Sequence, residues 1–151
     1  MHINFTIATE KDIPEILDMM EAFNAIDHYP FRRDKTRKNL MEFLANPSLG
    51  RLWLINHDNL TVGYIVLAYE YSFEHDGKDT FIDELFIKAD YINKGIGKLA
   101  MDYIQTASQK LGVKVIHLEV EPNNKNGLKL YKEKGYTDNG RYLLSKKVNT
   151  D

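Results

Sequence analysis

The sequence predicts a mixed α+β fold, in which a mostly antiparallel sheet of six to seven strands is flanked by about four helices. Three consecutive strand-like segments, residues 51–56, 61–72 and 80–87, are separated by short turns, which is typical of an antiparallel meander. A long amphipathic helix and then another strand-like segment follow them, and such a strand–helix–strand unit adds a parallel strand with a helix on the sheet. No Pro- or Gly-rich linker and no repeat divides the 151 residues, so we expect one domain over residues 1–151.

The chain opens with a strand and two helices. Ile3–Ile7 alternates apolar and polar residues, as a half-buried strand does. Thr9 is the predicted N-cap of the first helix, with Asp12 three residues later in the position that completes a capping box. A second helix is expected over residues 34–45. The apolar residues of the first helix follow helical spacing: Ile13, Ile16, Leu17, Met20 and Phe23.

Turns and helix ends divide the rest of the chain. His57–Asn59 and Glu74–Lys78 are the predicted turns of the meander. After it we expect a helix to residue 111, a strand over residues 113–121 and a shorter helix over residues 124–134, which Gly135 closes. Residues 136–137 and 141–147 are predicted as closing strands.

Composition excludes several classes of protein. Lys and Arg number 20 against 22 Asp and Glu, a net charge of −2 that gives no footprint for nucleic acid. The longest apolar run, Tyr64–Tyr69, is too short to cross a membrane, and the N-terminus shows no secretion signal, so a cytoplasmic location is expected. There is no cysteine, which excludes disulfides, thiolate metal sites and a cysteine nucleophile. The five histidines show no metal-ligand spacing, so no metal is expected.

The segment Tyr91–Lys98 lies between a predicted strand and the long helix. Gly95 and Gly97 let the backbone approach a ligand closely. The free N–H groups of the first helical turn, at the positive end of the helix dipole, can bind phosphate oxygens, and Lys94 and Lys98 add positive charge. Glycine spacing alone fits a tight strand-to-helix turn equally well.

Two familiar phosphate-binding patterns fit this segment poorly. A P-loop needs Ser or Thr after Gly-Lys and, before it, a glycine separated from Gly-Lys by four residues, but Leu99 and Ile92 occupy these positions. The dinucleotide fingerprint matches Gly95, Gly97 and Ala100, yet seven residues separate it from its strand. A nucleotide-binding oxidoreductase fragment therefore remains a minor alternative.

Residues 92–97 match the pattern Arg/Gln-x-x-Gly-x-Gly/Ala except that Ile92 replaces the usual Arg or Gln. An acidic, apolar strand precedes this segment, and the stretch from Asn124 to Tyr131, followed by Gly135-Tyr136, matches an Asn…Leu-Tyr…Gly-Phe pattern. Over residues 80–137 the chain thus resembles the GNAT superfamily of acetyl-CoA-dependent N-acetyltransferases, with the first pattern as its motif A. The resemblance implies a GNAT-like fold and a single N-acetyltransferase domain.

The resemblance also implies acetyl transfer from acetyl-CoA to a primary amine of a small cationic molecule or a peptide. The backbone of Leu85, Phe86 and Ile87 is expected to pair with the pantetheine arm as an added strand would. Asn124 is expected near the pantetheine or the sulfur, or as the N-cap of its helix. The loop residues expected to hold the CoA pyrophosphate are Asn93, Lys94, Gly95, Ile96, Gly97 and Lys98.

Three side chains are candidates for the chemistry. The resemblance places Tyr131 as the general acid that protonates the departing thiolate. An alkylamine with a pKa of ~10 is mostly protonated at neutral pH, so a base must take its proton. Glu84 is the preferred base, Asp83 is its rival, and water is the third option. Adjacent strand residues point to opposite faces, so only one of the two carboxylates is expected to face the acceptor amine.

The acceptor is expected to meet a ring-rich loop and an acidic stretch. By resemblance, His28, Tyr29 and Phe31 lie where the family builds its acceptor pocket. Residues 70–84 hold six acidic side chains against one Lys, which would attract a cationic amine. The expected partners are this acceptor and a second copy in a homodimer, with neither nucleic acid nor a membrane. A non-catalytic acyl-CoA-binding sensor or scaffold is the alternative function.

Overall fold

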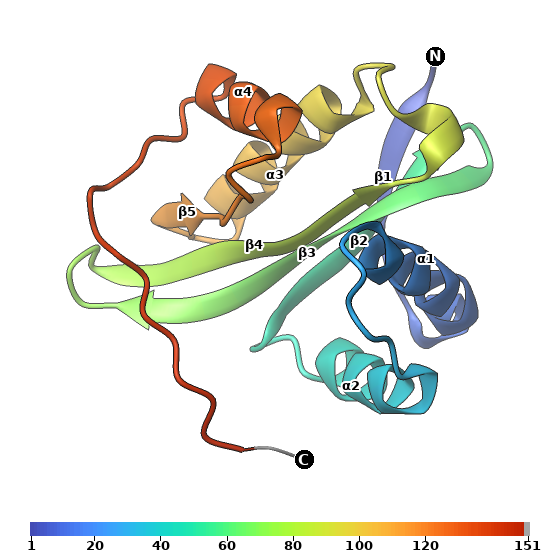
Figure 1. Ribbon diagram of the computed structural model, residues 1–151, viewed down its shortest axis with the longest axis horizontal. Helices are drawn as coiled ribbons and strands as arrows, with labels where there is room; N and C mark the ends of the chain where they lie inside the picture. Colours follow the sequence, from blue (N-terminus) through green and yellow to red (C-terminus); the bar gives the residue numbers. More distant parts are fainter. Residues whose placement is uncertain (150–151) are drawn as a thin grey trace.

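The computed structural model describes residues 1–149 and shows one five-stranded sheet between two layers of helices (Figure 1). The strands lie in chain order, and β1 to β4 pair antiparallel while β5 joins β4 in parallel. The predicted α+β class is therefore confirmed, and the last two residues of the predicted domain lie outside the described range. The strands are β1 Ile3–Ile7, β2 Gly50–His57, β3 Leu60–Ser72, β4 Gly77–Ile87 and β5 Val115–His117.

Four α-helices cover the two faces of the sheet. A 3-10 turn, η1 (Glu10–Asp12), precedes α1, and the predicted capping box is present: the backbone N–H of Thr9 donates to Asp12 Oδ2 at 2.8 Å. Helices α1 and α2 lie on one face of the sheet, and α3 and α4 lie on the other (Figure 1). Their bounds are α1 Ile13–Ile26, α2 Arg33–Ala45, α3 Ile96–Lys110 and α4 Lys125–Glu133.

Each face of the sheet has its own apolar core, because side chains alternate along the strands. On the α1/α2 face, Tyr64, Val66 and Phe86 from the sheet are buried with the inner side of α1. On the α3/α4 face, the buried cluster consists of Trp53, Ile65, Leu67, Ile82, Met101 and Ile104. Strand β4 contributes to both cores, with Phe86 on the α1/α2 face and Ile82 on the α3/α4 face.

The predicted number of strands was slightly too high. The described residues form five strands, since β5 has only three residues and segments 136–137 and 141–147 form none. A closing strand needs a partner edge, and a three-residue β5 offers little of one. Tyr142 and Leu144 are instead 94% and 89% exposed, and Arg141 holds this segment by two 3.0 Å hydrogen bonds to the carboxylate of Glu74.

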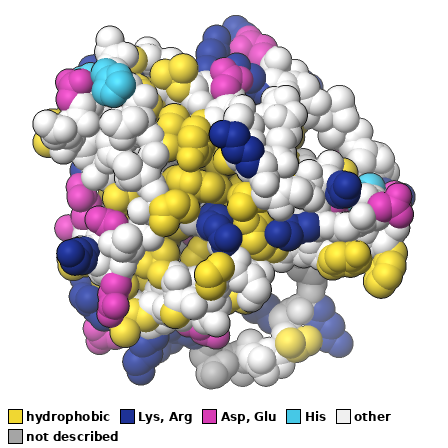
Figure 2. Space-filling model, turned by 180° about the vertical axis from the view of Figure 1, so that it is seen from behind, with side chains coloured by type: hydrophobic (Ala, Val, Ile, Leu, Met, Phe, Trp, Pro, Cys, Tyr) yellow, Lys and Arg dark blue, Asp and Glu magenta, His cyan; other side chains and the backbone are white. Residues whose placement is uncertain are grey.

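The surface is mixed in character. Seen from behind, hydrophobic side chains gather in the middle of the face, with Lys and Arg side chains among and around them (Figure 2). Within residues 1–149, no helix combines the length and the apolar character that a membrane span requires.

Candidate active site

Strand β4 separates from β5 halfway along its length. It pairs with β3 from Gly77 to Ile87, but it pairs with β5 only over Asp79–Phe81. Beyond that point, within residues 1–149, no strand lies beside the outer edge of residues 82–87. An edge of this kind can take up an extended ligand through its backbone groups. The predicted pantetheine-binding residues Leu85, Phe86 and Ile87 lie on this edge.

A β-bulge lies at the start of the unpaired part of β4. Ile82 is opposite Leu67 and Glu84 is opposite Val66, so Asp83 is an extra residue without a partner in β3. Ile82 consequently belongs to the core on the α3/α4 face, whereas Glu84 lies on the α1/α2 face with Tyr64. The bulge thus separates two side chains that a regular strand would place on one face.

Glu84 is a carboxylate held in a partly buried position. It accepts a 2.6 Å hydrogen bond from the hydroxyl of Tyr64, which is fully buried. Burial raises the pKa of Glu84; the Tyr64 hydrogen bond acts in the opposite direction, and the nearby charge of Asp83 adds to the rise. A carboxylate with a raised pKa at a strand edge is suited to accept a proton near neutral pH.

Asp83 differs from Glu84 in its setting. Its side chain is exposed, although desolvation also raises its pKa. Both carboxylates therefore remain available as bases, and of the two Glu84 is the one that a neighbouring side chain orients.

The loop before α3 has the backbone shape of an anion site. After the 3-10 turn η2 (Ala89–Tyr91), Asn93 and Gly95 adopt left-handed conformations, with φ of 60° and 81°. Gly95 is the N-cap of α3, and its carbonyl accepts the first helical hydrogen bond, from Leu99 at 3.2 Å. The backbone N–H groups that precede Leu99 lie in the first turn, where a helix provides them no partner of its own.

Gly97 lies where three elements meet. A Cβ at this position would be 3.3 Å from Cδ2 of Leu130 in α4 and 3.8 Å from Cδ1 of Ile87 in β4. The lack of a side chain therefore lets α3 approach both α4 and the end of β4.

The charged side chains of this loop differ in their contacts. The ammonium of Lys98 lies 3.6 Å from a carboxylate oxygen of Glu133 in α4, and that of Lys94 lies 5.3 Å above the ring of Tyr91. Ile96 is buried in a cluster with Ile55, Val62 and Ala100. Ile92, in the position of the usual Arg or Gln, is 52% exposed.

Helix α4 supplies the candidate acid. Tyr131 packs against the α3/α4 core and makes an edge-to-face contact with Tyr136, with the ring centroids 6.3 Å apart. Burial raises its pKa, so its phenol remains protonated at neutral pH. At the start of α4, the side chain of Asn124 accepts a 2.9 Å hydrogen bond from the backbone N–H of Gly127, which is the predicted N-cap arrangement.

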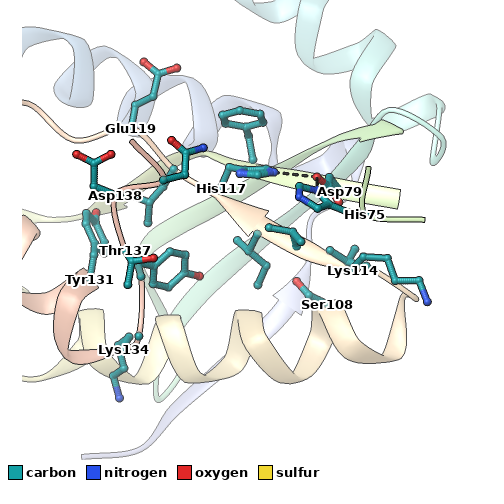
Figure 3. A pocket seen from close by; sticks show the side chains of 18 of the residues that line it. His75, Asp79, Ser108, Lys114, His117, Glu119, Tyr131, Lys134, Thr137 and Asp138 are labelled. Atoms are coloured by element: carbon teal, nitrogen blue, oxygen red, sulfur yellow. Dashed lines mark hydrogen bonds and ion pairs between the residues drawn. The ribbon is translucent and has the colours of Figure 1, made fainter. Parts of the chain in front are cut away.

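A cleft of about 1320 Å³ opens beside Tyr131. It lies among β5, the end of α3, α4 and the segment that follows α4 (Figure 3). In Figure 3, Tyr131 and Asp138 lie at one side of the cleft and His75, Asp79 and Lys114 at the other, with His117 between them.

The ring-rich loop between α1 and α2 only partly approaches Glu84. Phe31 packs against the core that contains Tyr64 and Phe86, and so lies on the same face as Glu84. His28 and Tyr29 are exposed, and Tyr29 is fixed through its backbone N–H to the carbonyl of Asn24 at 3.0 Å.

Sequence reasoning missed two features. Tyr64 was not identified as the partner of Glu84, because that contact depends on the register of β3 against β4. It also missed a cluster of His75, Asp79 and His117, whose ligand atoms all lie within 4.8 Å of one another. The spacing of His75 and Asp79 is visible in the sequence, but His117 joins them only through the pairing of β5 with β4.

Comparison with known proteins gives a family match and a curated relative. The model of the acetyltransferase (GNAT) family matches residues 16–136. An uncharacterised N-acetyltransferase of Methanocaldococcus jannaschii is 20% identical over 132 residues, which are 86% of this chain and 58% of that protein. The chain thus spans a little over half the length of this curated relative.

Solved structures share the fold. An integron cassette protein from the mobile metagenome of Cole Harbour Salt Marsh is 27% identical, with a TM-score of 0.87 over 97% of this chain and 91% of that one. An aminoglycoside N-acetyltransferase in complex with CoA is 13% identical, with a TM-score of 0.81 over 98% of this chain and 96% of that one.

Proposed function

Because this chain belongs to the acetyltransferase (GNAT) family, we propose that it transfers the acetyl group of acetyl-CoA to a primary amine of a small cationic molecule or a peptide. The observation that carries the proposal is the unpaired edge of β4 after Phe81, which ends at Ile87 beside Gly97 in the first turn of α3. That arrangement offers a strand edge for an extended arm and a helix N-terminus for a diphosphate within one site.

In the proposed complex, acetyl-CoA lies along the edge of β4 and ends at the glycine loop. The pantetheine arm pairs with the backbone of Leu85–Ile87, and Asn124 lies beside it on α4. The diphosphate binds the free amides between Asn93 and Lys98. Gly95 supports this placement, because it is left-handed and a Cβ there would meet nothing within 4 Å, so the start of α3 is open to a ligand. Gly97 supports it in another way, because its contact with Ile87 brings the end of β4 beside the first turn of α3.

The proposed reaction needs a base, an oxyanion donor and an acid. Glu84 takes a proton from the ammonium form of the acceptor, directly or through water, with Asp83 as the alternative base. The free amine then attacks the thioester carbonyl, and a backbone N–H of the β4 edge stabilises the oxyanion. When the C–S bond breaks, Tyr131 protonates the CoA thiolate, and the attacking nitrogen loses its second proton, which restores the phenol of Tyr131. The products are the N-acetyl amine and CoA, and Glu84 releases the first proton to water.

A cationic acceptor is supported by the charges near β4. Residues 70–84 contain six carboxylates, but Glu74 is paired with Arg141, Asp79 lies between two imidazoles and Glu84 binds Tyr64. The remaining side chains, of Glu70, Asp76 and Asp83, are left to attract a cation. That a CoA-bound neighbour in fold is an aminoglycoside acetyltransferase also supports this class. We place the acceptor near Phe31, with His28 and Tyr29 at the outer rim.

The test is an acceptor screen with the purified full chain. Acetyl-CoA is incubated with polyamines, aminoglycosides and lysine peptides, and the released thiol is measured. Acetylation of at least one cationic amine is expected, with neutral alcohols of similar size as controls. If CoA binds tightly while no amine is acetylated, the chain is an acyl-CoA sensor or scaffold and the enzymatic proposal is wrong.

We further propose that the chain forms a homodimer. The support is the exposed apolar segment after α4, in which Tyr142, Leu143 and Leu144 face solvent. Light scattering on the eluting protein is expected to give twice the chain mass; the mass of one chain would contradict the proposal.

A further inference from the structure

Three metal-ligating side chains converge at the end of the sheet opposite the glycine loop. His75 lies in the turn between β3 and β4, Asp79 lies on β4, and His117 is the last residue of β5. Asp79 Oδ2 is 2.6 Å from Nδ1 of His75 and 2.8 Å from Nε2 of His117 (Figure 3). The three side chains come from three separate segments and direct their polar atoms at one point.

Asp79 is the buried centre of this cluster. Its side chain is 1% exposed, while the two imidazoles are 29% and 25% exposed and border the cleft. Within the described part of the chain, its second carboxylate oxygen, Oδ1, is buried and has no hydrogen-bond partner. Burying a carboxylate with one oxygen unsatisfied is costly unless a cation compensates it.

We propose that His75, Asp79 and His117 form a binding site for a divalent transition metal ion of the zinc class. Two imidazole nitrogens and one carboxylate oxygen are the ligands of mononuclear zinc and related sites. Ligands at ~2.0–2.1 Å from a tetrahedral ion are about 3.3 Å apart. The two observed contacts therefore need to open by only about half to three-quarters of an ångström to admit the ion.

Coordination is balanced in protons. In the cluster a ring nitrogen of each imidazole lies within hydrogen-bond distance of Asp79 Oδ2, so a proton on that nitrogen must leave it before the nitrogen can bind an ion. When the ion binds, that proton moves to the other ring nitrogen, and the freed lone pair coordinates the metal. The carboxylate contributes its negative charge, and the remaining coordination position is open to water or another ligand from the cleft.

The surroundings resemble the outer shell of a metal site. Glu74 Oε1 lies 3.8 Å from Nε2 of His75, the nitrogen that carries the proton after coordination, and Arg141 fixes this carboxylate by two hydrogen bonds. The ring of Phe81 packs on that of His117, with centroids 5.0 Å apart. Metal-bound histidines are commonly oriented by such partners.

The proposed ion would link the β3–β4 turn to β5. It would lie where β4 and β5 are still paired, just before β4 separates from β5. This inference does not rest on the acetyltransferase function: metal binding can fail while acetyl transfer stands, and the reverse also holds. Its readouts are accordingly metal content, affinity and thermal stability rather than turnover.

The test uses the tag-free full chain, stripped with EDTA and transferred to metal-free buffer. Titration calorimetry with ZnCl₂ is expected to give one ion per chain, and Zn²⁺ is expected to raise Tm in a way that EDTA reverses. Co²⁺ provides a second probe, since a bound ion gives a visible absorption band of defined stoichiometry.

Two variants and a control locate the ion. His117→Gln and Asp79→Asn should each weaken Zn²⁺ binding at least about tenfold, as even the loss of outer-shell partners does. His2→Gln, which removes an exposed histidine outside the cluster, should bind like the unaltered chain. Circular dichroism checks folding, and if Asp79→Asn does not fold, His117→Gln decides.

The proposal is overturned if the unaltered chain binds no Zn²⁺ at millimolar concentration. It is equally overturned if folded His117→Gln retains full affinity and the same Co²⁺ spectrum, because the ion would then lie elsewhere.

Discussion

The two halves of β4 differ in what lies beside them. Gly77–Phe81 lies between β3 and β5, and its residues Asp79 and Thr80 are fully buried. Ile82–Ile87 pairs with β3 alone, and it carries the bulge and Glu84. One end of β4 is therefore an interior part of the sheet, and the other end is an edge that pairs on one side only.

This difference shows how a short neighbour creates a site. Because β5 ends at His117, the backbone groups on the outer edge of residues 82–87 are left for something other than a strand. The paired half should accordingly govern stability, and the unpaired half together with α3 and α4 should govern ligand binding and turnover. Five predictions test this division.

The largest effect is expected from Tyr131→Phe. Loss of the phenol removes the proposed proton donor but leaves a ring of the same shape against the core, so kcat should fall about 100-fold or more while the Kd for CoA stays unchanged. Steady-state kinetics and calorimetry give the two values. Tyr136→Phe is the matched control, because it removes the hydroxyl of the adjacent ring; equal losses in both variants would reduce Tyr131 to a packing role.

Gly97→Asp should weaken CoA binding about 100-fold. A carboxylate about 5 Å from a diphosphate costs about 3 kcal/mol at an effective dielectric constant of 20. Gly97→Ala separates charge from size: its Cβ would be 3.3 Å from the flexible end of Leu130, so only a small loss is expected. Calorimetric titration with CoA measures both, and unchanged affinity in the Asp variant would remove the diphosphate from this loop.

Tyr64→Phe should move the acid limb of the pH–rate profile upward. In the proposed reaction, turnover requires ionised Glu84; burial raises the pKa of this carboxyl and the Tyr64 hydrogen bond lowers it. Loss of a hydrogen bond to a charged group is worth about one pKa unit or somewhat more, so the limb should move about one unit to higher pH. The profile of kcat/KM measures the shift; an unmoved limb would favour Asp83 or water as the base.

Ionisation of Glu84, which the proposed reaction needs, lowers the stability of the fold. A folded-state pKa above the unfolded value means that ionisation of Glu84 destabilises the fold. Its contribution is fully present below the usual pKa of a glutamate and is lost as the pH rises through the raised value. As the pH rises through this range, the free energy of unfolding of the unaltered chain should fall relative to that of Glu84→Gln, and urea unfolding measures both.

The smallest effect is expected in the paired half. The hydroxyl of Thr80 donates a 2.9 Å hydrogen bond to the carbonyl of Ala68 on β3 and is fully buried. Thr80→Val keeps the shape and should cost about 1 kcal/mol of unfolding free energy while kcat and CoA affinity remain unchanged. Urea unfolding and kinetics check this pair of outcomes; a loss of turnover would show that the two halves are not separable.

Local sequence was sufficient for most elements of the fold. Turn residues such as Asp76-Gly77, the capping pair Thr9 and Asp12, and the helical spacing of α1 and α3 each act within a few residues, so their positions were predicted to within a few residues. The closing strands failed for the opposite reason. Residues 141–147 have strand-like composition, but a strand exists only through an edge that another part of the chain provides.

The site shows the same limit. The glycine loop and Tyr131 belong to motifs of fixed spacing, and Gly97 of that loop lies beside Ile87 at the end of β4. The Tyr64–Glu84 hydrogen bond and the meeting of His117 with Asp79 depend instead on strand register. A single-residue shift in register would break either contact, and no local pattern in the sequence sets it.

The extra residue at Asp83 sets the orientation of everything that follows it in β4. Inward and outward positions alternate along a strand, and one inserted amino acid exchanges them from that point on. If Asp83 paired with β3 as a regular residue, Glu84 would instead lie on the face of Ile82 and Met101, and Leu85 would face Tyr64, exchanging an ionisable group for an aliphatic one on both sides. A single residue therefore decides on which face of the sheet this family member presents its buried carboxylate.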